Sequence, residues 1–174
     1  LSGDSYFGNG VLKSTDGGQS WALLGQSLAR TSIRRLHVDP NDANIVLVAS
    51  SRGSSGRDAS DISPPRPVPG VWRSTDGGNN WTRSLTGQAT ALEVDPTNFS
   101  RQYAAIGEQT PGFPSDAPPS PNGVYRSTNG GATWSRVEGP WGPEPAEANR
   151  SAVGRIELAL APSNPSVLYA GIQI

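Results

Sequence analysis

The chain has 174 residues and a formal net charge of −1, with 14 basic and 15 acidic side chains. It lacks the basic surplus of a nucleic-acid-binding domain, so no nucleic-acid partner is expected. The absence of cysteine excludes disulfides and thiol chemistry, and no apolar run approaches the ~20 residues of a membrane-spanning helix.

In chain order, the predicted elements are short β-strands, and strands of the same types recur in the same order. A strand over 10–13 runs into an octad at 14–21, and a strand ending in a proline turn near 39–41 is followed by an apolar strand over 45–50. The same types recur as strands at 70–73, 92–95, 102–107, 123–126, 158–160 and 167–172 and as octads at 74–81 and 127–134. Glycine and proline fall between the strands, which indicates turns, and no segment has a helical period.

This order defines a repeating unit of four strands in which the octad is the turn between the third and fourth strands. The unit has the size of a propeller blade, so we expect an all-β propeller. The blade boundaries are predicted as the end of one blade over 1–32, full blades over 33–88 and 89–154, and the first half of another over 155–174. Propellers have roughly four to eight blades, so the chain is expected to be part of a ring completed by more of the same chain or by a partner.

The octads follow the pattern Ser-x-Asp-x-Gly-x-x-Trp, with Asn129 replacing aspartate in the third. Through these octads and their flanking strands, which cover most of the chain, the sequence resembles the Asp-box or BNR-repeat β-propeller superfamily. It is similar in particular to bacterial proteins related to sortilin-type receptors, xyloglucan-degrading glycosidases and the photosystem II stability and assembly factor. The resemblance implies that the boxes lie away from any active site.

The octad residues are predicted to be structural. The acidic or amide side chain accepts hydrogen bonds from turn amides, the glycines permit positive φ, and the tryptophan buries a large ring beside the hairpin. Asn129 keeps an acceptor without a charge, which a hairpin tolerates and a catalytic acid does not. The residues assigned this role are Ser14, Asp16, Gly18, Trp21, Ser74, Asp76, Gly78, Trp81, Ser127, Asn129, Gly131 and Trp134.

Three long, proline-rich connections, at 51–69, 108–122 and 139–154, are predicted to leave one face of the propeller. Long connections of this kind are usually functional, so this face is expected to bind a protein partner or a larger complex. Trp141 is either an exposed aromatic anchor or a cap on the core beneath its own loop. The predicted partner-binding residues are Arg52, Arg57, Arg66, Phe113, Trp141 and Arg150.

An enzymatic role has weaker support in the sequence. Glycoside hydrolysis requires two carboxylates ~5–9.5 Å apart, and no spacing singles out a pair among the loop candidates Asp58, Asp61, Asp116, Glu144 and Glu147. Sialidases share the repeat, but their arginine trio and tyrosine nucleophile have no matching motif here, and Tyr103, Tyr125 and Tyr169 are expected in the core. No residues that would form a catalytic triad or a metal site accompany His37 in the sequence. No catalytic residue, metal or cofactor is assigned.

The sequence therefore favours a non-enzymatic binding or scaffold propeller, exported or on the outer side of a membrane, and a subunit or assembly factor of a membrane-associated complex is one such role. The alternative is a xyloglucanase-like glycoside hydrolase that acts on a polysaccharide across the loop face, with a glycan as the ligand.

Overall fold

The computed structural model describes residues 8–51, 67–107, 122–141 and 153–173. These residues form twelve β-strands and one 3-10 helix of three residues. Within these ranges, no helix is long and apolar enough to cross a membrane.

The strands form four antiparallel sheets. The first holds β1 (Val11–Lys13) and β2 (Ala22–Leu24), and the helix η1 (Gln26–Leu28) follows it. The second holds β3 (Ser32–Asp39), β4 (Asp42–Ser51), β5 (Gly70–Ser74) and β6 (Thr82–Thr86). The third holds β7 (Ala89–Asp95), β8 (Asn98–Ile106), β9 (Gly123–Ser127) and β10 (Ser135–Arg136), and the fourth holds β11 (Ile156–Leu160) and β12 (Leu168–Ile172).

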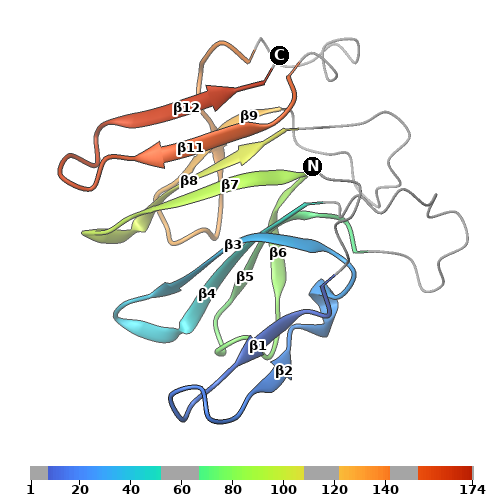
Figure 1. The fold of residues 1–174 in the computed structure, drawn as a ribbon. Coiled ribbons are helices and arrows are strands. Elements are labelled where there is room, and N and C mark those ends of the chain that lie inside the picture. Colours follow the sequence, from blue (N-terminus) through green and yellow to red (C-terminus); the bar gives the residue numbers. More distant parts are fainter. Residues whose placement is uncertain (1–7, 52–66, 108–121, 142–152, 174) are drawn as a thin grey trace, which may run out of the picture.

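Each complete sheet has its four strands in chain order, and an octad joins its third and fourth strands. This arrangement confirms the predicted four-stranded blades with octad hairpins. Figure 1 shows the sheets stacked face to face in the order of the sequence, from β1–β2 at the bottom to β11–β12 at the top.

The hydrophobic core lies between successive sheets because each strand alternates its side chains between two faces. In β4, Leu47 and Ala49 pack toward the third sheet with Leu92 and Ile106, whereas Val48 packs toward the first sheet. Leu47, Leu92 and Ile106 are fully buried, and burial of each contributes ~1.5–3 kcal/mol. The remaining core lies between the third sheet and β11–β12.

The octads form nearly identical hairpins. In the second octad, the hydroxyl of Ser74 accepts a hydrogen bond from the Gly78 amide (2.9 Å), and Asp76 Oδ1 accepts one from the Asn80 amide (2.9 Å). The other octads repeat both bonds. Gly77 and Gly78 have φ values of 71° and 97°, a region that favours glycine. The Ser74 and Asp76 side chains thus bind amides of their own turn, and a purely structural role for the octads stays a prediction.

The octad tryptophans are not equally buried, although their sequences match. Trp81 and Trp134 are partly buried against the preceding sheet, but Trp21 is mostly exposed. The expectation that Tyr169 lies in the core is wrong, because its side chain is mostly exposed, whereas Tyr125 is buried. Both exposed rings lie on the outer sheets, which pack against another sheet on only one face within the described residues.

Candidate functional site

The long connections begin and end at one end of the blades, which we call the loop end. Antiparallel pairing places the last residues of β4 and β8 beside the first residues of β5 and β9. It also places the end of β6 beside the start of β5, and the Gly107 amide donates to the Gln88 carbonyl (3.0 Å) before β7. The tight turns of β3–β4 and β7–β8 lie at the opposite end, on the left in Figure 1. The predicted single loop face therefore has a structural basis in the strand order.

Buried polar side chains link backbone segments by hydrogen bonds at the loop end. The hydroxyl of Ser50 contacts both the amide and the carbonyl of Gly70 (3.1 Å each) and accepts a hydrogen bond from the Trp72 indole (3.2 Å). Thr90 donates its hydroxyl hydrogen to the Ile156 carbonyl (2.7 Å) and so joins the third sheet to the fourth. Asn122 donates to the Val153 carbonyl (2.9 Å). Each bond gives a buried polar group a partner and so avoids the cost of leaving it unpaired. Together the bonds link the strand ends from which the long connections leave.

Trp141 is the one predicted partner-binding residue that lies within the described ranges. Its half-buried indole donates to the Val137 carbonyl (2.7 Å) and packs on the core between the third and fourth sheets. A Cβ on Gly123 would lie 2.7 Å from its Cδ1 atom, so the ring fits closely over the backbone. These contacts account for a packing role, and its partner-binding role stays a prediction.

The other candidates of the loop face lie outside the described residues. They are the partner-binding candidates Arg52, Arg57, Arg66, Phe113 and Arg150 and the carboxylates Asp58, Asp61, Asp116, Glu144 and Glu147. The structure therefore does not test whether any two of these carboxylates lie at the separation that glycoside hydrolysis requires.

Isolated ionisable side chains elsewhere have structural partners. His37 Nε2 lies 3.1 Å from the Leu92 carbonyl and links the second sheet to the third. Arg155 forms an ion pair with Glu157. Burial alone would raise the pKa of Asp95, but hydrogen bonds from Thr97 and the ion pair with Arg101 lower it to about 2. Among the described residues, no three His, Cys, Asp or Glu side chains could together hold a metal ion.

A contact that sequence reasoning missed joins neighbouring blades beside the octads. Arg73 is the penultimate residue of β5, and its Nε atom donates to the carbonyl of Gly130 in the next octad (2.9 Å). Lys13 ends β1, and its Nζ atom donates to the carbonyl of Gly77 in the following octad (3.2 Å). The basic residue at this repeated position is visible in the sequence, but its partner is not, because the two residues lie in different blades. We call this contact the inter-blade latch.

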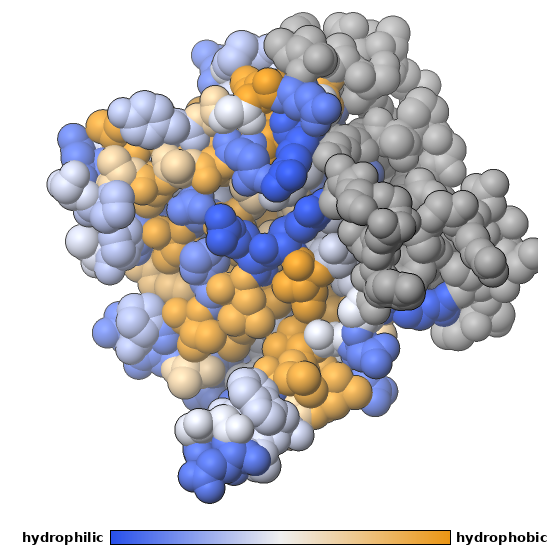
Figure 2. Space-filling view, viewed as in Figure 1, coloured by the Kyte–Doolittle hydropathy of each residue, from blue (hydrophilic) through white to orange (hydrophobic). Residues whose placement is uncertain are grey.

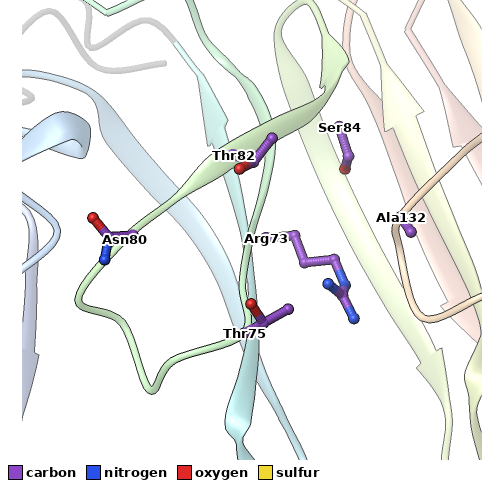
Figure 3. Close-up of a pocket in the computed structure, with 6 residues that line it drawn as sticks. All are labelled: Arg73, Thr75, Asn80, Thr82, Ser84 and Ala132. Carbon is purple, nitrogen blue, oxygen red and sulfur yellow. The ribbon is translucent and has the colours of Figure 1, made fainter.

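A pocket of about 250 Å³ lies beside the contact between Arg73 and Gly130. Figure 3 shows the guanidinium of Arg73 pointing toward the segment that carries Ala132, with two threonine hydroxyls nearby. The lining residues are Arg73, Thr75, Asn80, Thr82, Ser84 and Ala132. This lining contains no carboxylate, so it offers no acid–base pair for hydrolysis.

Comparison with known proteins agrees with this architecture. The model of the BNR/Asp-box repeat matches residues 125–136. The chain is 28% identical over 151 residues to a xyloglucanase of Paenibacillus sp. and 28% identical over 150 residues to a xyloglucanase of Acetivibrio thermocellus, each match covering 74% of this chain. A xyloglucanase of Hypocrea jecorina is 26% identical over 153 residues. The chain spans only 13% of the first relative and 16% of the other two.

Two solved structures share the fold. A crystal structure of an ancestral GH74 enzyme superposes with a TM-score of 0.61 and 23% identity over 94% of this chain and 19% of that chain. The GH74 enzyme of Niastella koreensis superposes with a TM-score of 0.54 and 22% identity over 99% of this chain and 25% of that chain. Together with the four-stranded sheets and their octad hairpins, these likenesses identify the chain as a run of consecutive β-propeller blades of the BNR/Asp-box repeat type.

Proposed function

We propose that the protein is part of a glycoside hydrolase that acts on a polysaccharide of the xyloglucan class. The observation that carries this proposal is the similarity to xyloglucanases over 74% of the chain. It reverses the order of the sequence-based hypotheses, in which a non-enzymatic scaffold came first.

The loop end is the surface where such a substrate would bind. A polysaccharide needs a long, rigid platform, and the buried network of Ser50, Thr90 and Asn122 ties the backbone together there. Half-buried Trp141 supplies an aromatic ring at its edge. Because polysaccharides are too large to enter a cell, the proposal includes export of the protein.

Hydrolysis would require two carboxylates of the loop face at a separation of ~5–9.5 Å. One would protonate the leaving oxygen, and the other would activate water or attack the sugar. The candidates are Asp58, Asp61, Asp116, Glu144 and Glu147.

The test measures reducing ends released from xyloglucan and from mixed-linkage β-glucan, together with binding in xyloglucan-containing native gels. Each of the five candidates is changed to its amide, and Asp42→Asn in the β3–β4 turn is the matched control. Loss of a general acid or base lowers turnover ~10²–10⁴-fold, so we expect a loss of this size in two variants and none in the control. The proposal would be refuted if the parent protein neither bound xyloglucan nor released reducing ends from it.

The scaffold hypothesis is the competing proposal. It assigns the same loop end to a protein partner, such as a component of a membrane-associated complex. Deletion of 52–66 or 108–121 would then abolish partner binding while the protein stays folded by circular dichroism. Glycan binding and hydrolysis that disappear in these deletions would favour the hydrolase instead.

A further inference from the structure

The pocket beside Arg73 lies between the two complete sheets. One wall comes from β5, β6 and the octad that joins them, and Ala132 of the third octad lines the other side. Both walls therefore lie within the described residues. The octads lie with the tight turns, since the Gly77 amide donates to the Asn44 carbonyl (2.9 Å). The pocket is thus at the opposite end of the blades from the loop end, where the polysaccharide is proposed to bind.

The guanidinium of Arg73 brings hydrogen-bond donors to this pocket that the described residues do not use. Its Nε atom donates to the Gly130 carbonyl, but its two Nη atoms have no partner among the described residues. In Figure 3 the guanidinium lies between the side chains of Thr75 and Ala132. An arginine is always charged, and the Nη edge of its planar fork matches two oxygens of a carboxylate, sulfate or phosphate group.

Two threonine hydroxyls add neutral donors to the lining. The hydroxyls of Thr75 and Thr82 have no hydrogen-bond partner among the described residues. The carboxylate of Asp76, in the same octad, is not part of the lining. Its oxygens accept hydrogen bonds from the Ser74 hydroxyl and from the amide and side chain of Asn80. The lining therefore combines one positive charge with hydroxyl groups, a composition that suits an anion.

The corresponding position between the first and second sheets has an apolar lining instead. Counted from each octad tryptophan, Ala22 takes the place of Thr82, and Leu24 takes the place of Ser84. Leu24 packs over the next octad, because a Cβ on Gly78 would lie 3.4 Å from its Cδ1 atom. The hydroxyls of the pocket are therefore not a feature of the repeat. They are particular to the junction between the two complete sheets.

The tryptophan of the third octad differs from the other two at the same junction. Trp81 donates its indole hydrogen to the Gly78 carbonyl of its own octad (2.8 Å), and Trp21 makes the same bond within the first octad. Trp134 instead donates across the junction to the Ser84 hydroxyl (3.0 Å). This bond fixes a lining side chain of one sheet against the octad of the next, so the Trp134 indole can report on the pocket.

We propose that this pocket binds a small oxyanion, which is the carboxylate of an acidic sugar or a sulfate or phosphate group. The Nη edge of Arg73 holds two oxygens of the anion, and the Thr75 and Thr82 hydroxyls donate to the same group. The site is separate from the loop end, so it is independent of the proposed hydrolase activity.

The size and polarity of the pocket limit the ligand further. Its volume of about 250 Å³ lies just below the ~300–1,000 Å³ of sites for drug-sized ligands. It therefore suits one charged group or one acidic sugar unit, and not a segment of a polysaccharide. Figure 2 shows hydrophobic residues gathered over the lower half of the molecule, where Figure 1 places β1 and β3. None of the exposed large hydrophobic side chains of the described residues lines the pocket, so an apolar ligand is not expected.

The indole N–H signal of Trp134 in a ¹H–¹⁵N NMR spectrum tests binding, because the indole bonds to Ser84 in the lining. Trp134→Phe identifies this signal among those of the five tryptophans. Sodium sulfate, sodium phosphate and sodium glucuronate are titrated at an ionic strength held constant with sodium chloride, and glucose is the neutral control. We expect a saturable shift with an oxyanion and none with glucose. Tighter binding of glucuronate would identify an acidic sugar as the ligand, and tighter binding of sulfate or phosphate would identify a tetrahedral anion.

Two substitutions locate the anion. Arg73→Lys keeps the charge and can keep the inter-blade latch, as Lys13 does, but it lacks the planar fork, so affinity is expected to fall ~10-fold or more. Thr82→Ala introduces the residue of the first junction and is expected to lower affinity ~2–10-fold. Thr128→Ala, at the Thr75 position of the third octad, is the matched control and should bind like the parent protein.

Circular dichroism establishes that each variant is folded. The proposal would be overturned if no oxyanion gave a saturable shift or if glucose shifted the signal equally. Unchanged affinity in both Arg73→Lys and Thr82→Ala would overturn it as well, because binding would then occur elsewhere.

Discussion

Adjacent glycines of the third octad are predicted to respond very differently to alanine. Gly130 and Gly131 both have positive φ, at 69° and 77°. A Cβ on Gly130 would meet no atom within 4 Å, whereas a Cβ on Gly131 would lie 2.6 Å from Leu47 Cδ2 and 2.8 Å from Gln102 Oε1. Leu47 and Gln102 are both fully buried, so neither side chain can move into open space.

The magnitude has two parts. An alanine in the left-handed region costs ~1–2 kcal/mol, and both substitutions share this term. Overpacking a filled core adds ~1–3 kcal/mol, and only Gly131→Ala has this term. We therefore expect Gly130→Ala to lower the free energy of unfolding by ~1–2 kcal/mol and Gly131→Ala by ~2–5 kcal/mol. In a domain of this size, each 1 kcal/mol corresponds to ~2–4 °C in Tm.

Urea unfolding followed by tryptophan fluorescence measures this difference. The comparison requires an unchanged m value, because a changed m value would indicate a different denatured or native state. Equal losses for the two variants would refute the argument that contact with Leu47 and Gln102, rather than the shared backbone strain, decides the cost.

Three further predictions concern the octads and the tight turns. Ser74→Ala leaves the buried Gly78 amide without its acceptor and is expected to lower the free energy of unfolding by ~1–3 kcal/mol, measured by urea denaturation with Thr75→Ala as the exposed control. Arg73→Ala removes the contact with the Gly130 carbonyl and should lower the free energy of unfolding by ~0.5–1.5 kcal/mol, whereas Arg126→Ala, at an exposed position that makes no such contact within the described residues, should change it by close to nothing. The pKa values of Asp76 and Asp95 are lowered to about 2, so their contribution to stability is fully present above their ordinary pKa near 4 and is lost as the pH falls toward 2. Asp95→Asn should therefore weaken the decline of Tm between about pH 4 and 2, and an unchanged decline in a thermal-melt series would contradict this assignment.

The blade pattern was predictable from the sequence because it depends on short-range signals. Each octad hairpin is held by hydrogen bonds between residues at most four positions apart, such as Ser74 to Gly78 and Asp76 to Asn80. The turn after β7 is equally local, since the Asp95 carboxylate accepts the amide of Thr97 (2.9 Å). Such signals recur wherever the residues recur, so the strand order follows from the repeat.

The sequence predicted where the long connections leave the blades, and the site itself stays a prediction. The strand order places the long connections at one end, but the geometry of the candidate carboxylates depends on loops outside the described residues. Trp141 shows why local composition alone did not predict whether a side chain is exposed or packed on the core. Its proline- and glycine-rich surroundings are compatible with an exposed anchor, yet its indole packs on a core formed by two sheets.

By itself, the sequence determined the octad hairpins, because the hydrogen bonds that make them join near neighbours, and it indicated the four-stranded blades because the same strand types recur in the same order. Only the tertiary structure decided how each copy of the repeat is used. The matching residues Trp21 and Trp81 differ in burial because, within the described residues, a sheet lies against the second ring and none against the first. The latch from Arg73 to Gly130 spans 57 residues, and no local pattern specifies such a partner. Contacts between blades depend on the stacking of whole sheets, which the residues of one blade do not encode.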